Sequence, residues 1–154
     1  MTRGQFPLTT MLLVGLLILQ CWAQETSSVA RVEAKRMEIP RYLPLAQQAA
    51  VSGEVTLHLT VNKAGKVVSV DATNAQPNGW GKGFASMASD AAKQSEFVCA
   101  SCSGDTFEHT VTYQFQFPAI PKDACTLRPP IPASKVDSAS HVTVRPSAWP
   151  CVQP

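Results

Sequence analysis

The strictest pattern in this chain is an alternation of apolar or aromatic residues with polar residues from Phe107 to Phe117. Successive side chains of a β-strand point to opposite faces, so this alternation predicts one long strand with an aromatic face turned toward a core. The residues on that face are Phe107, His109, Val111, Tyr113, Phe115 and Phe117. We expect this strand to be the backbone of a sheet, because it is both long and aromatic.

Two further segments supply partners for this strand. Residues from Glu54 to Val61 alternate strictly between polar and apolar, which predicts a half-buried strand. The turn sequence Asn62 to Gly65 follows, and Lys66 to Ala72 returns as a second strand. These two strands therefore form an antiparallel hairpin.

Two short helices complete the expected fold. Pro40 and Pro44 mark the start of the first helix, which ends by Gly53. After the loop of residues 73–82, apolar residues recur at helical spacing from Phe84 to Ser95, which predicts an amphipathic helix. The order helix, strand, strand, helix, strand predicts an α+β fold, with a three-stranded antiparallel sheet and two short helices packed on one face. A proline-rich tail follows.

The first residues resemble an export signal. Arg3 precedes an apolar run at residues 11–19, and Cys21-Trp22-Ala23 then gives a small-x-small pattern. This arrangement predicts a secretory signal peptide at residues 1–23; the alternative is an uncleaved signal anchor at residues 6–23. The rest divides into a linker at residues 24–39, a domain at 40–118 and a disulfide-bearing tail at 119–154.

Cysteine usage agrees with export. Of the five cysteines, Cys21 lies in the signal segment, so four remain in the mature chain. An even number of cysteines in a small exported chain predicts disulfides, although the sequence leaves several connectivities open. We favour pairs Cys99–Cys102 and Cys125–Cys151. The second pair would hold the tail against the domain.

Charge and motifs narrow the function classes. The net charge of +2 is spread without a basic run, so the electrostatic footprint of a nucleic-acid binder is missing. The sequence gives no catalytic constellation, cofactor motif or metal-ligand spacing, and we expect no enzyme activity, no cofactor and no metal. The one enzyme-like motif is Cys99-Ala100-Ser101-Cys102, which leaves a thiol-disulfide redox protein as an alternative.

Residues 40–118 resemble the C-terminal domain of the TonB energy transducers. The resemblance depends on the order and spacing of several short segments rather than on any one motif. The matching segments are Pro40-Arg41-Tyr42-Leu43-Pro44, Gly53-Glu54-Val55, Asn62-Lys63-Ala64-Gly65-Lys66-Val67, Gln76-Pro77-Asn78-Gly79 and the strand Thr106 to Phe117. The proline-rich tail is additional to the usual domain.

The resemblance implies an interaction module rather than an enzyme. Domains of this family pair their last strand with an extended segment of an outer-membrane receptor and act in TonB-dependent transport. Carried over, this implies a periplasmic protein that binds an envelope protein by strand addition, with membrane contact only if the N-terminal segment is retained. The implied binding residues are Phe107, His109, Val111, Thr112, Tyr113, Gln114 and Phe115. A structural envelope protein whose own tail covers this edge, through residues 142–144, is the remaining alternative.

Overall fold

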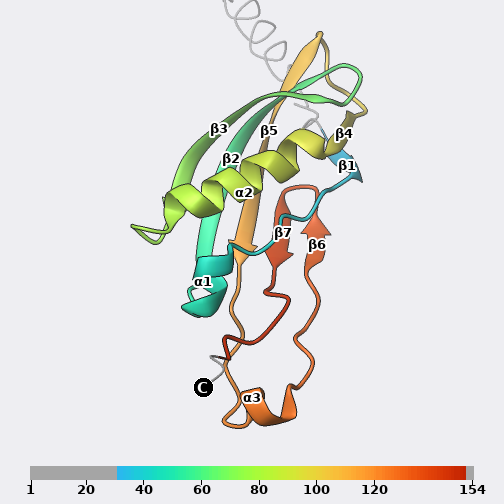
Figure 1. The fold of residues 1–154 in the computed structure, drawn as a ribbon. Coiled ribbons are helices and arrows are strands. Elements are labelled where there is room, and N and C mark those ends of the chain that lie inside the picture. Colours follow the sequence, from blue (N-terminus) through green and yellow to red (C-terminus); the bar gives the residue numbers. More distant parts are fainter. Residues whose placement is uncertain (1–30, 152–154) are drawn as a thin grey trace, which may run out of the picture.

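The computed structural model describes residues 31–151 of the chain (Figure 1). The predicted signal segment, residues 1–23, lies outside the described residues, as do residues 24–30 of the predicted linker. No helix within the described residues is long and apolar enough to cross a membrane.

A five-stranded mixed sheet forms the centre of the fold, with strand order β3-β2-β5-β7-β6. The strands are β2 (Gly53–Asn62), β3 (Val67–Gln76), β5 (Thr106–Phe115), β6 (Lys135–Ser138) and β7 (His141–Val144). Strands β2 and β5 pair antiparallel over ten consecutive residues without a bulge, from Gly53 opposite Phe115 to Asn62 opposite Thr106. The alternation of apolar and polar residues therefore gives this pair a single register.

The predicted hairpin of β2 and β3 is present, and its turn requires Gly65. This residue has a φ of +84°, and a Cβ atom there would collide with the carbonyl oxygen of Phe97. A glycine is therefore needed both for the backbone conformation and for the close approach of β4.

Helix α2 (Gly81–Gln94) covers one face of the sheet, as predicted, and turns its apolar side to β2 and β3 (Figure 1). The other predicted helix, α1 (Pro44–Gln48), lies at the end of β2 and contributes the buried Ala46 to the core. Small side chains on α2 allow the helix to lie close to the sheet. The fully buried core comprises Ala46, Val55, Leu57, Leu59, Val61, Phe84, Ala88, Ala92, Phe97, Val111, Tyr113, Phe115, Val142 and Val144. Phe84 and Phe115 stack with ring centroids 4.5 Å apart.

The α+β class is confirmed, but the predicted three-stranded sheet is wrong because the tail adds β6 and β7 to it. The boundary drawn at residue 118 is therefore not a boundary of the core. Strand β7 pairs in parallel with β5, and its residues Val142 and Val144 are fully buried. The sequence of β7 is too short to reveal by itself that its apolar residues enter the core.

The linker interpretation is also wrong in its described part. Strand β1 (Val32–Arg36) pairs antiparallel with β4 (Glu96–Cys99) and forms a separate two-stranded sheet beside the main one. Ion pairs join the two strands, because the carboxylate of Glu96 lies within reach of Lys35, Arg36 and Lys66. The pKa of the Glu96 carboxyl is below its usual range, mainly because the Lys66 amine donates a hydrogen bond to it.

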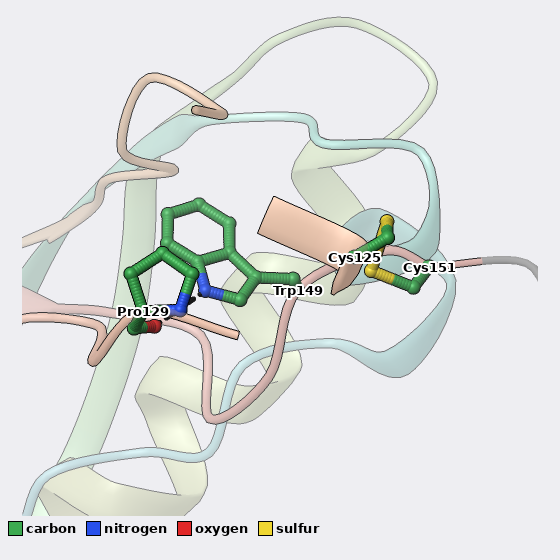
Figure 2. Close-up of a disulfide and its surroundings, with 4 residues drawn as sticks. All are labelled: Cys125, Pro129, Trp149 and Cys151. Carbon is green, nitrogen blue, oxygen red and sulfur yellow. Dashed lines mark hydrogen bonds between the residues drawn. A yellow bond between two sulfur atoms is a disulfide. The ribbon is translucent and has the colours of Figure 1, made fainter. Parts of the chain in front are cut away.

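The remainder of the tail forms a loop that is held at both ends. It contains the short helix α3 (Ala124–Leu127), and the disulfide Cys125–Cys151 joins this helix to the end of the described chain (Figure 2). The indole Nε1–H of Trp149 donates to the carbonyl oxygen of Pro129 at 2.7 Å. Both predicted disulfides, this one and Cys99–Cys102, are present.

Candidate binding edge of the sheet

Strand β5 has two edges, and hydrogen bonds show which atoms lie on each. The amide N–H of Thr112 donates to Ser140 O at 2.9 Å, and that of Gln116 donates to Val144 O at 2.8 Å. Both amides therefore face away from β2. Since N–H groups of alternate residues in a strand point to the same side, the amides of Glu108 and Thr110 face the same outer edge.

The second half of this outer edge is already paired. Strand β7 runs parallel to β5 and places His141 opposite Thr112 and Val144 opposite Phe115. The prediction that Thr112, Tyr113, Gln114 and Phe115 offer a free edge is therefore wrong. The physical reason is that Val142 and Val144 gain a buried position only when β7 lies beside β5.

The first half of the outer edge carries no strand partner among residues 31–151. Pairing with β7 begins at Thr112, so the outer side of residues 106–111 is open. A hollow of about 400 Å³ borders this half-edge. Its lining residues are Val32, Glu108, His109, Thr110 and Ser140. We call the outer side of residues 106–111 the open half-edge.

The side chains of the open half-edge divide between the two sheet faces. Phe107 and His109 lie partly buried on the core side, and Val111 is fully buried. The His109 ring lies 5.0 Å from the ring of Phe97, and its Nε2 lies 2.9 Å from the carbonyl oxygen of Ala139. His109 thus packs against the core and positions the loop before β7. The predicted residues Phe107, His109 and Val111 support this half-edge, and the backbone of Glu108 and Thr110 forms it.

The outer edge of β3 is longer but irregular. Its register with β2 shifts twice, leaving Thr73 and Val68 as extra residues on β3. Val68 is 58% exposed, as expected where a bulge lifts a residue out of the ladder. Bulges twist an edge and interrupt its hydrogen-bonding groups, so β3 is a poorer template for an added strand than the regular β5.

The other free edge, on β6, is short and charged. Lys135 and Asp137 form an ion pair there, and the hydroxyl of Thr143 donates to Asp137 Oδ2 at 2.6 Å. The pKa of the Asp137 carboxyl is below its usual range. The main cause is the hydrogen bond from the Lys135 amine, and the next is the hydrogen bond from the Thr143 hydroxyl. Short length and charge both protect an edge from further pairing.

The Cys99–Cys102 pair lies away from any helix start. Cys99 ends β4 and pairs with Val32 of β1, while α2 has already ended at Gln94. The helix N-termini of the described residues therefore do not point at this disulfide, and the usual helix-dipole stabilisation of a reactive thiolate is missing. The pair closes a short loop at the end of the two-stranded sheet.

Two features of the site were not predicted. The backbone groups of Glu108 and Thr110 carry no side-chain signature, because any residue supplies an amide and a carbonyl. Strand β6 has no apolar alternation, and all four of its residues are exposed. The alternating segment His141 to Val144 did signal a strand, and the parallel pairing of β7 with β5 is what divides the edge.

Comparisons with known proteins found similarity to solved structures but none to a family model or a curated protein. Among solved structures, the solution NMR structure of the Pseudomonas aeruginosa TonB CTD is similar, with 19% identity and a TM-score of 0.43. The match covers 59% of this chain and 89% of that chain.

Proposed function

We propose that the chain is an exported, non-catalytic interaction module that binds an extended segment of an envelope protein. The added segment pairs with the open half-edge of β5, residues 106–111. The observation that carries this proposal is a regular strand edge beside a hollow, which no strand among residues 31–151 pairs with, within a sheet whose other edges are bulged or short. An edge of this kind offers main-chain donors and acceptors to an incoming strand.

Features of the sequence support the proposed export and the proposed class of partner. The apolar segment before Gln24 and the two disulfides both support an oxidising compartment outside the cytoplasm. The resemblance of residues 40–118 to TonB C-terminal domains supports an envelope protein as the partner. In the more specific form of the proposal, the partner is an outer-membrane receptor segment and the role is in TonB-dependent transport.

A second candidate is a structural envelope protein with no strand-addition partner. The pairing of β7 with residues 112–115 favours it, because the chain already covers half of its own edge. Hydrogen exchange bears on this choice. The strand-addition proposal requires the amides of Glu108 and Thr110 to exchange at least ~100-fold faster than those of Thr112 and Gln116 in the free protein. Equal protection of all four amides would mean that the whole edge is covered.

The sharpest test compares two variants at one position. Glu108→Pro removes the outward N–H and leaves the bonds to β2 in place, whereas Glu108→Ala keeps the N–H. Both variants lose the carboxylate that accepts from Thr60 Oγ1 at 3.0 Å, so that loss cancels in the comparison. Circular dichroism first establishes that each variant is folded.

Binding is then measured by photocrosslinking in intact cells. A photoreactive residue at Thr110 should capture an envelope protein, and the same residue at Ser69 on the β3 edge should not. We expect Glu108→Pro to reduce capture about 10-fold, because a donor is lost and the ring intrudes on the edge, while Glu108→Ala leaves capture nearly unchanged. A folded proline variant that captures as well as the alanine variant would show that strand addition does not occur here.

A further inference from the structure

Three hollows meet where the tail packs against α1 and the segment before it. One of about 580 Å³ is flanked by Arg41 and Arg145, and one of about 630 Å³ lies beside Arg128. A third, of about 410 Å³, connects them, because it shares Gln47 and Gln48 with the first and Trp149 with the second. We call this surface the junction groove, defined by Arg41, Gln47, Gln48, Arg128, Arg145 and Trp149.

The charge of the junction groove has one sign. Three arginines line it, and no aspartate or glutamate lines any of the three hollows. Within residues 31–151, the guanidinium groups of Arg41 and Arg128 make no hydrogen bond or ion pair with another side chain. Arg145 donates one bond, from Nη2 to Gln116 Oε1 at 3.1 Å, and keeps its other donors available. Among residues 31–151, no acidic side chain forms an ion pair with these arginines, so this part of the chain leaves the positive charge of the groove unpaired.

The apolar part of the groove is held in place. Trp149 is fixed by its bond to Pro129 and by an edge contact with Phe117, whose ring centroid lies 6.4 Å away. Cys151, two residues later, is tied to Cys125 of α3 (Figure 2). A ligand in the groove thus meets a pre-positioned indole, which reduces the entropy lost on binding.

We propose that the junction groove binds an extended acidic peptide segment of a partner protein. Carboxylates of the peptide pair with Arg41, Arg128 and Arg145, and an apolar side chain packs against Trp149. The amide side chains of Gln47 and Gln48 lie between these ends and can both donate to and accept from a peptide backbone. Charge, apolar surface and amides together fit a peptide better than a simple anion. This site is separate from the open half-edge and does not depend on it.

The test uses the mature chain and a labelled peptide in which Asp alternates with Leu. A peptide with Asn in place of Asp is the matched ligand control. The double variant Arg41→Gln/Arg128→Gln removes two cations whose side chains form no hydrogen bond or ion pair among residues 31–151. Lys82→Gln/Lys93→Gln removes the same charge from α2, whose residues line none of the three hollows.

Binding is followed by fluorescence anisotropy and by the NMR signal of the Trp149 indole N–H. We expect the Asp peptide to bind about 10-fold more tightly than the Asn peptide and to move the Trp149 signal. We expect the arginine variant to weaken binding about 10-fold and the lysine variant to change it less than about twofold.

Three outcomes would overturn the proposal. The first is equal binding of both peptides, and the second is an equal effect of both double variants. In the third, vesicles containing anionic lipid bind with a dependence on Arg41 and Arg128 while the Asp peptide does not, which would assign the groove to a membrane surface instead.

Discussion

The two halves of the outer edge of β5 belong to one strand, yet the fold treats them differently. Residues 112–115 are paired with β7, whereas residues 106–111 are open beside a hollow. Their backbone groups are chemically the same, so the difference arises outside β5. Strand β7 carries Val142 and Val144 into the core, and among the described residues no comparable segment reaches the first half. An edge is thus closed where covering it also buries apolar side chains.

The largest loss of stability should come from replacing Val142, the buried side chain that holds β7 against residues 112–115 of β5. Val142→Asp places a charge at a fully buried position, and we expect it to destabilise the protein by about 4 kcal/mol or more. Val136→Asp is the matched control, because Val136 lies opposite Val142 on β6 and is 42% exposed. Urea denaturation of both variants measures the difference. Similar stabilities would show that β7 does not anchor the edge.

The two disulfides give the next comparison. Cys125 and Cys151 lie 26 residues apart in sequence and Cys99 and Cys102 lie three apart, so the first bond restricts the unfolded chain more. We expect Cys125→Ser/Cys151→Ser to cost about 3 kcal/mol and Cys99→Ser/Cys102→Ser about 2 kcal/mol or less. Thermal denaturation of the two double variants checks this order. A larger loss from the second pair would mean that the short loop stabilises the native state by contacts.

The stability of the protein should also depend on alkaline pH, because Tyr113 lies in residues 112–115, the part of β5 that pairs with β7. Burial, the main cause, raises the pKa of its hydroxyl to about 12, above the usual value near 10. The folded state therefore holds this proton more tightly than the unfolded state does. The associated stability is complete below about pH 10 and is lost as pH rises toward 12.

The stability lost is roughly 3 kcal/mol in full, because the two pKa values differ by about two units at ~1.4 kcal/mol each. Tyr113→Phe removes the ionisable group, so its stability should fall less over the same pH range. Chemical denaturation between pH 9 and pH 12 compares the two proteins. Parallel curves would place the hydroxyl of Tyr113 in contact with solvent. Tyr42, whose pKa burial also raises to about 12, is present in both proteins and does not affect the comparison.

Sequence patterns predicted the strands in which buried and exposed residues alternate and the helix in which buried residues recur at helical spacing. The strands β2 and β5 were placed within a few residues, since Val55, Leu57, Leu59 and Val61 all face one side. The predicted end of β3 at Ala72 and the predicted loop over residues 73–76 are wrong, because the strand continues to Gln76 through residues that resemble a loop. Edge strands are mostly exposed and lack a strong pattern, which explains the shortened prediction.

The sequence by itself determined the α+β class and the helix-covered hairpin, because apolar periodicity is a local property; it favoured the observed cysteine pairs, and the structure fixed their connectivity. Only the tertiary structure decided that the tail enters the sheet and that β1 pairs with β4. It also decided that, within the described part of the chain, the edge of β5 is open at Glu108 and Thr110 but closed from Thr112 onward. These features depend on which segments meet across long separations in sequence. Val142 and Val144 become buried only when β7 pairs with β5 in the assembled sheet, so the sequence of no single segment reveals this pairing.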